Sequence, residues 1–336
     1  MARREGTMPR NRKLIMNNEV RFVTMRTERG LPLLATPFMR LIIEGLLARA
    51  KELYPVIIGD LIVMGNHIHM FLVVLDPGVF DLFIRYFKTE SAHVINALKG
   101  ELKGTIWEEG YDAPPILTMN DLIRKSIYIY TNPQRANLVR TIEEYPNLST
   151  WRLLKTGCSA ELSTKRIRRL AVTALPAHEM SIGQTRRYSK DFENRLKDNL
   201  TLNLNPKACF EVLKSRSELS YDEYRRQVID GVRQQEARLE EKREEEKRPV
   251  LGNLALISQS ILRKHTPSKF GRRMICICSD IALRIAYIKR YRAYCEQYCE
   301  VYRAWQAGDR SRVFPPGFFP PGIRPTASLW PVSFWN

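Results

Sequence analysis

Two histidines occupy alternate positions in the segment MGNHIHM, residues 64–70. If this segment is a β-strand, His67 and His69 project from one face and Ile68 projects from the other. Two imidazoles held side by side on a rigid strand supply half of a divalent-metal site, because their mutual repulsion favours a bound cation or the neutral state. An exposed pair of histidines on a sheet surface is the simpler alternative, since the spacing alone is a weak motif.

A tyrosine and an asparagine stand four residues apart further along the chain. They are Tyr128 and Asn132, in the segment SIYIYTNPQRA at residues 126–136, and a helix would place both on one face. The Asn132 amide oxygen could complete a metal shell begun by two imidazoles. A phenol one turn away would then lie beside any phosphate bound to that metal. Tyr130 lies about 200° around the helix from Tyr128 and is expected to face away. The alternative role for Tyr128 is that of a half-buried core tyrosine.

The elements that must position these residues follow from the hydrophobic periodicity. The short break Gly65-Asn66 lets the two flanking apolar runs pair as a hairpin. The expected order is strand 21–26, helix 36–53, strand 55–63, strand 67–75, helix 79–98, strand 114–118, and a helix capped by Asn120 that ends near Pro133. This order predicts an α+β fold, with a four-stranded antiparallel sheet and helices on one face, as in ferredoxin-like and RNA-recognition domains.

Charge separates the chain into two parts. The 336 residues carry a net charge of +18, of which residues 1–150 contribute +3 and the remainder +15. We expect a catalytic domain at 15–150, a mostly helical basic extension at 151–313 that binds a polyanion, and an extended Pro/aromatic tail at 314–336. Residues 233–248 mix both charges and are expected to form a solvated helix face.

Both motifs together resemble those of the REP-associated tyrosine transposases, a branch of the single-tyrosine HUH (IS200-like) transposases. That family has His-hydrophobic-His on a central strand, followed by a helix reading Tyr-Ile-x-x-Asn-Pro-x-Arg-Ala. This chain supplies NHIHMFLVV and YIYTNPQRANLV, and the intervening FIRYFKTESAHVIN and TIWEEGYDAPPIL also fit. The resemblance spans about residues 15–150 and does not extend to the rear half.

The resemblance implies a single-stranded DNA endonuclease and strand transferase that acts on hairpins through a 5′-phosphotyrosine intermediate. It assigns Tyr128 as the nucleophile and His67, His69 and Asn132 as ligands of a divalent metal, Mg²⁺ or Mn²⁺. Lys88 matches the family's lysine on the long helix. The candidate DNA contacts are Lys88, Arg135, Lys165, Arg166, Arg168, Arg169, Arg186 and Arg187, with further basic pairs at 263–264 and 272–273.

Other interpretations remain open at this stage. A DNA-hairpin-binding protein that does not cleave would be expected to lack the tyrosine or a histidine. An RNA-recognition protein would display aromatic residues where the histidines stand. A replication initiator or relaxase would share the chemistry. The chain shows neither a signal peptide nor an apolar span, and its six cysteines suit reduced thiols in a bacterial cytoplasm, at the nucleoid. Monomer and homodimer are equally compatible with the sequence.

Overall fold

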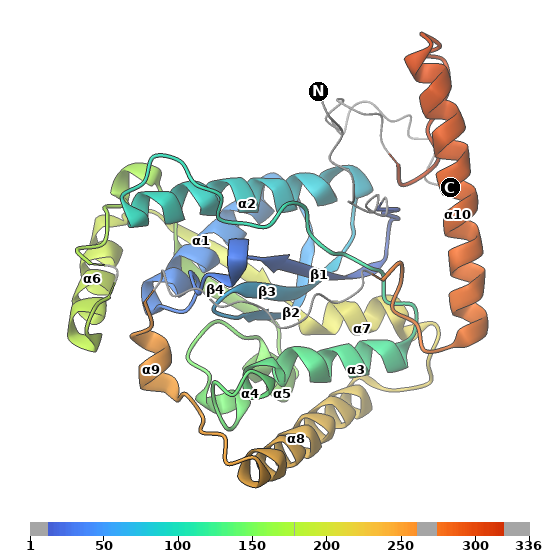
Figure 1. The fold of residues 1–336 in the computed structure, drawn as a ribbon. Coiled ribbons are helices and arrows are strands. Elements are labelled where there is room, and N and C mark those ends of the chain that lie inside the picture. The colour runs from blue at the N-terminus through green and yellow to red at the C-terminus, as the bar shows by residue number, and fades with distance from the viewer. Residues whose placement is uncertain (1–12, 178, 261–273, 319–336) are drawn as a thin grey trace.

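The computed structural model describes residues 13–177, 179–260 and 274–318, and these form an α+β fold (Figure 1). The strands are β1 Val20–Arg26, β2 Ile57–Val63, β3 His67–Val73, β4 Ala160–Lys165 and β5 Asn199–Leu204. The main helices are α1 Pro37–Leu53, α2 Pro77–Lys99, α3 Met119–Tyr130, α4 Asn132–Arg135, α5 Trp151–Thr156, α6 Ile182–Arg195, α7 Pro206–Lys214, α8 Tyr221–Glu245, α9 Asn253–Ile257 and α10 Ile281–Gln306. The predicted α+β class with a largely helical rear half is confirmed.

One mixed sheet connects the front and rear halves of the chain. Its strand order is β1-β3-β2-β5-β4. The β2–β3 hairpin and the β1–β3 pair are antiparallel, whereas β5 joins β2 in parallel through Ile58 and Leu204. The prediction of four strands was therefore wrong in number. The extension predicted to be mostly helical, residues 151–313, supplies both additional strands, β4 and β5.

The predicted strand at 114–118 does not form a regular strand. The segment runs along β1 and makes isolated bridges, including Arg21 with Pro115 and Thr24 with Asp112. Phe22 N still donates to Pro114 O at 3.0 Å. Pro114 and Pro115 lack the N–H groups that a continuous ladder requires, so pairing with β1 remains intermittent.

Helices cover both faces of the sheet, rather than the single face expected from the sequence (Figure 1). On one face, α1 and α2 pack with Val23, Met70 and Leu72 in the first hydrophobic cluster. On the other face, α3, α7 and α8 pack with residues such as Phe71 and Ile62 in a second cluster. Because strand residues alternate between the faces, β3 contributes to both clusters.

The helix that carries Tyr128 begins one residue before the predicted cap. Thr118, rather than Asn120, is the N-cap of α3, and its Oγ1 accepts a hydrogen bond from Asp121 N at 3.2 Å. The helix ends at Tyr130, and Pro133 lies in the following short helix α4. Only Thr131 separates the end of α3 from α4, which contains the Asn-Pro-x-Arg turn.

The predicted tail at 314–336 is described only as far as residue 318. Phe314 and Phe318 are buried, and their rings lie 5.2 and 5.3 Å from that of Tyr298. The remaining tail aromatics, and the basic pairs at 263–264 and 272–273, lie outside the described residues. No helix in the described part of the chain is long and apolar enough to cross a membrane.

A buried carboxyl group fixes α3 on the sheet. Asp60 of β2 is 1% exposed, and it accepts hydrogen bonds from Ser126 Oγ at 2.6 Å and from Tyr130 Oη at 2.8 Å. The Ser126 hydroxyl also contacts Tyr224 Oη of α8 at 2.9 Å. Burial raises the pKa of Asp60 to about 6, although both hydroxyl donors act in the opposite direction.

The raised pKa of Asp60 predicts a stability that falls as the pH rises. Its folded pKa exceeds the ordinary value of 3.8, so the protonated carboxyl stabilises the fold at low pH, and this contribution is lost as the pH rises through 6. Relative to Asp60→Asn, the wild type should lose about 2.4 kcal/mol between pH 4 and pH 7. Urea unfolding of both proteins across this range measures the difference, and a pH-independent difference would contradict the assignment.

Candidate active site at the histidine pair

The histidine pair lies on the face of β3 that α3 covers. The ring centroids of His67 and His69 are 4.7 Å apart. Ile68 between them points to the opposite face and is fully buried in the first cluster. The predicted alternation of the strand is confirmed. The two imidazoles therefore share one wall of a site whose other wall is a helix.

Hydrogen bonds at the Nδ1 atoms set the orientation of both rings. His67 Nδ1 lies 2.7 Å from Asn66 Oδ1, so the tautomer with its proton on Nδ1 donates to that oxygen and keeps a lone pair on Nε2. His69 Nδ1 lies 2.9 Å from the hydroxyl of Thr24, its partner across the β1–β3 ladder. In both rings Nε2 is the nitrogen left for a ligand. Metal-binding histidines are commonly held this way by their second nitrogen.

Both imidazoles are neutral at pH 7. Burial lowers the pKa of His67 to about 4, and the cation of Arg26, paired with His67 across the ladder, acts in the same direction. Burial also holds the pKa of His69 well below its usual value, aided by His67, Arg26 and Lys125. A neutral imidazole offers a lone pair, so the electrostatics suit cation binding rather than a protonated pair.

Tyr128 reaches this face from α3. Its ring centroid lies 5.4 Å from that of His69 and 6.2 Å from that of Phe22. Phe22 stacks on His69 at 5.1 Å, so the three rings form one cluster. Tyr128 is half-buried, whereas Tyr130 is fully buried and bonded to Asp60. The prediction that Tyr130 faces away from the site is confirmed.

Asn132 brings an amide to the same place. Its side chain is close enough to His67 to act on that histidine's pKa, which it raises, and Asn132 is 7% exposed. Its Nδ2 is buried without a hydrogen-bond partner. An unsatisfied amide beside two lone pairs is chemically suited to complete a shell around a cation, with its oxygen turned inward. In the described part of the chain, no group of three or more His, Cys, Asp or Glu side chains could hold a metal by itself.

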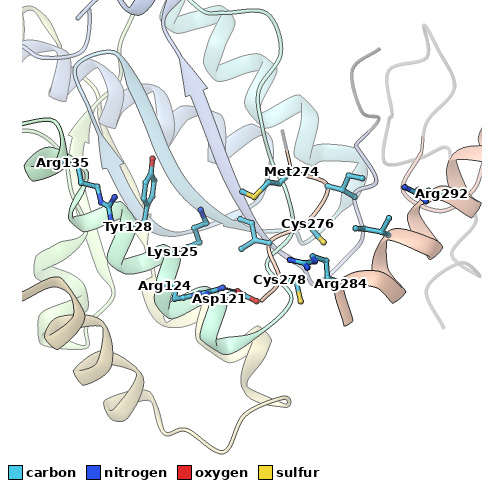
Figure 2. A pocket seen from close by; sticks show the side chains of 13 residues that line it. Asp121, Arg124, Lys125, Tyr128, Arg135, Met274, Cys276, Cys278, Arg284 and Arg292 are labelled. Carbon is cyan, nitrogen blue, oxygen red and sulfur yellow. Dashed lines mark hydrogen bonds and ion pairs between the residues drawn. The ribbon is translucent and has the colours of Figure 1, made fainter. Parts of the chain in front are cut away.

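Two cations flank the phenol on α3 and α4 (Figure 2). Lys125 Nζ lies 5.0 Å from the centroid of the Tyr128 ring, and the guanidinium carbon of Arg135 lies 5.7 Å from it. Arg135 was a predicted DNA contact and is brought to the site. Lys125 and Arg26 were not predicted. Lys125 could have been found, because it precedes Tyr128 by three residues and shares its helix face. Burial lowers the pKa of Lys125.

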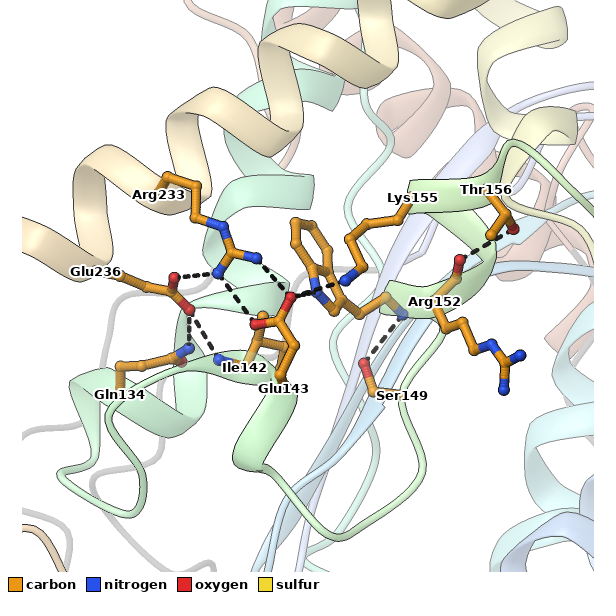
Figure 3. Close-up of polar contacts among 10 residues, drawn as sticks. Gln134, Ile142, Glu143, Ser149, Arg152, Lys155, Thr156, Arg233 and Glu236 are labelled. Carbon is orange, nitrogen blue, oxygen red and sulfur yellow. Dashed lines mark hydrogen bonds and ion pairs between the residues drawn. The ribbon is translucent and has the colours of Figure 1, made fainter.

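Helix α8 holds the Asn-Pro-x-Arg turn from behind (Figure 3). Gln134 Nε2 donates to Glu236 Oε1 at 2.6 Å, and Ile142 N donates to the same oxygen at 2.8 Å. Arg233 donates to the other carboxylate oxygen at 2.7 Å. Arg243 is also buried and donates to Gln134 O at 3.2 Å. The segment 233–248 is therefore more than the solvated face expected from its charges, because it supports the turn that carries Asn132.

The other predicted DNA contacts lie elsewhere. Lys88 belongs to α2 on the opposite face of the sheet, where its ammonium donates to the carbonyls of Glu108 and Gly110. The basic cluster at residues 165–169 lies beside β4, an edge strand of the sheet. Its side chains contact neighbouring residues of the protein: Lys165 donates to Asn199, and ion pairs join Arg166 to Glu52, Arg168 to Asp198 and Arg169 to Glu90. Arg186 and Arg187 are exposed on α6. Their role in DNA binding stays a prediction, but the structure does not place them beside Tyr128.

Comparison with known proteins gives one distant likeness. No family model matches the chain, and no curated protein matches it. Among solved structures, the chain is similar to a REP-associated tyrosine transposase bound to a REP hairpin, with 20% sequence identity and a TM-score of 0.38. The match covers 43% of this chain and 84% of the other.

The support from α8 predicts a specific loss of stability. Glu236→Ala would leave the amide of Gln134, the backbone N–H of Ile142 and the Arg233 guanidinium without their common acceptor. We expect unfolding to require about 3 kcal/mol less free energy, measured by urea denaturation, with faster hydrogen exchange in residues 132–137. Glu241→Ala, an exposed position on the same helix, should change stability by less than about 0.5 kcal/mol. Equal effects of the two substitutions would refute the supporting role of Glu236.

Proposed function

We propose that the chain is a metal-dependent single-stranded DNA endonuclease and strand transferase, which acts on hairpin DNA through a 5′-phosphotyrosine intermediate. One observation carries the proposal: the phenol of Tyr128 and the imidazole of His69, which are 59 positions apart in the chain, come together with 5.4 Å between their ring centroids. Beside them lie a second neutral imidazole and an unsatisfied buried amide. A half-buried core tyrosine would not require this set of neighbours.

The chemistry assigned to Tyr128 conserves the energy of the phosphodiester. Its phenol oxygen attacks the scissile phosphorus, the bond from phosphorus to the 3′-oxygen breaks, and the 5′-phosphate becomes esterified to the tyrosine. The phenol loses its proton and the departing 3′-oxygen gains one. Attack by a 3′-hydroxyl on the tyrosine ester reverses the step and joins strands, which is how one residue serves cleavage and transfer.

His67, His69 and Asn132 would hold the divalent metal, for which we propose Mn²⁺ or Mg²⁺. When bound, such an ion polarises a phosphate oxygen and stabilises the charge that develops in the transition state. Other residues of the protein orient the ligands and add charge beside the phenol. Thr24 and Asn66 orient the imidazoles, and Lys125 places a positive charge 5.0 Å from the centroid of the Tyr128 ring.

A single strand is the substrate that suits this site. The phenol lies between a strand and a helix, and the scissile phosphate must come between them, which a flexible backbone achieves more easily than the fixed groove of a duplex. The preference for a hairpin beside that strand follows from the motif resemblance described above. The positive charge of the rear half, +15 over residues 151–336, supports a polyanionic partner.

Substitution of the phenol tests the nucleophile. Tyr128→Phe removes one oxygen and should abolish the covalent protein–DNA adduct, while leaving hairpin binding within about twofold of wild type. The assay incubates each protein with a 5′-labelled and a 3′-labelled single-stranded hairpin library and Mn²⁺, then separates the products on denaturing gels.

Tyr130→Phe is the matched control, because it removes a hydroxyl from the same helix. That hydroxyl bonds to Asp60, so its loss should cost about 1 kcal/mol of stability and preserve the adduct. If Tyr128→Phe forms the adduct as well as wild type, the proposed nucleophile is wrong. If wild type binds but never cleaves, the catalytic function is wrong.

Metal binding can be measured without DNA. Free Mn²⁺ gives an electron paramagnetic resonance signal that is lost on binding, so titration of the protein reports occupancy. His67→Ala and His69→Ala should each weaken binding by about tenfold or more, since each removes one of three protein ligands. His93→Ala, an exposed histidine on α2, should bind as wild type. Unchanged binding in the first two variants would remove the metal site from the proposal.

A further inference from the structure

A segment of the rear half forms part of the surroundings of Tyr128. We define it as the C-terminal arm, residues 274–292, which comprises an extended stretch and the first half of α10. Ile277 N donates to Pro115 O at 2.8 Å, and Leu117 N donates to Ile277 O at 3.1 Å. Ser279 N donates to Asp121 Oδ2 of α3 at 3.0 Å. These bonds attach the arm to the irregular edge beside β1 and to the start of α3.

Apolar packing reinforces that attachment. Cys276, Cys278 and Tyr287 of the arm are buried with Leu117 and Leu14 in a third hydrophobic cluster. Two independent kinds of contact therefore hold the arm against the front of the molecule. Its position relative to α3 is set by the fold rather than by a loose surface contact.

A cleft of about 770 Å³ lies between α3 and the arm. Figure 2 shows Arg135, Tyr128 and Lys125 on one side of it, and Arg284 and Arg292 of α10 on the other. The residues that line it include five basic side chains and one acidic side chain, Asp121. The nucleophile proposed above is thus part of the wall of a strongly cationic cleft.

Most of the positive charge in the cleft is not neutralised by the protein. Arg124 forms an ion pair with Asp121 at 2.6 Å. Among the described residues, no acidic side chain lies within ion-pair distance of Lys125, Arg135, Arg284 or Arg292. The contrast with the locally paired cluster at residues 165–169 is direct. Unpaired cations that face one another across a cleft are suited to bind a polyanion.

The cleft also offers apolar surface. Met274, which is 50% exposed, lines it together with Ile275 and Ile288 of the arm. Single-stranded nucleic acid needs both features, cations along the backbone and apolar or aromatic surface for the bases. A bare phosphate or sulfate would make no use of the three apolar side chains. The combination therefore favours a strand over a small anion.

We propose that this cleft binds the single DNA strand that leads to Tyr128, with Arg284 and Arg292 of the C-terminal arm in contact with its phosphates. The inference extends the proposed function. It rests on that function for the claim that the bound DNA strand leads to a nucleophilic tyrosine. It assigns the rear half a direct part in substrate binding at the catalytic tyrosine. The C-terminal arm supplies one wall of the cleft and α3 supplies the other.

The test measures binding of a fluorescent oligothymidine to the full chain by anisotropy, in EDTA so that no cleavage occurs. Arg284→Ala/Arg292→Ala should bind roughly tenfold more weakly than wild type at low salt. Its plot of log K against log salt should be shallower by about 1.4, because two phosphate contacts are lost. The matched control, Lys289→Ala/Arg303→Ala, removes the same charge from exposed positions on α10 that do not line the cleft.

The outcomes separate this inference from the catalytic proposal. A selective loss in the Arg284/Arg292 variant supports the cleft, even if no covalent adduct is ever found with Tyr128. Equal losses in the two double variants would show that only net charge matters and would overturn it. Failure of wild type to bind the oligothymidine would also overturn it. Melting curves monitored by circular dichroism should be the same for all three proteins, because the four substituted side chains are exposed.

Discussion

The carboxyl group of Asp60 is the constraint on which the arrangement of the site depends. A carboxyl buried in an apolar core needs hydrogen-bond partners, and here both come from α3, one turn apart. With Ser126 and Tyr130 tied to β2, the helix can present only its other flank to β3 and β1. That flank carries Tyr128, and the phenol therefore meets the histidine pair. A rotation of α3 by one residue would break both hydrogen bonds and also withdraw the phenol.

The rear half of the chain reinforces this arrangement from the outside. Tyr224 of α8 joins the hydroxyl of Ser126, and Glu236 holds the turn that carries Asn132. The close approach of α8 to α3 depends on Gly231, where a Cβ atom would lie 2.3 Å from the side chain of Ile127. The catalytic candidates thus belong to the front of the chain, and α8 of the rear half adds to the contacts that keep them in position.

The sequence alone predicted the strands and helices that carry His67, His69 and Tyr128. Alternation placed His67 and His69 on one face, and the helical period separated Tyr128 from Tyr130. Predictions from the sequence were wrong or missing where a residue's structure depends on partners distant in the chain. The strands β4 and β5 are short and half exposed, although the alternating NLTLNL of β5 was a readable signal. The basic cluster at residues 165–169 resembled a binding surface because two of its acidic partners, Glu52 and Glu90, lie 114 and 79 residues away in the chain. Arg26 reaches His67 only through the strand register, which a single sequence does not reveal.

The parallel pairing of β5 with β2 has a consequence for how the chain folds. The two strands are joined through Ile58 and Leu204, so the middle of the sheet is completed by a segment made long after its neighbour. Contacts between residues this far apart close slowly, because the loop between them must first be ordered. Until β5 arrives, β2 is an open edge rich in isoleucine and leucine, of the kind that pairs with other chains. A nascent chain that stalls before residue 199 would therefore be prone to aggregate. The sheet is therefore complete only after residue 204 has been synthesised.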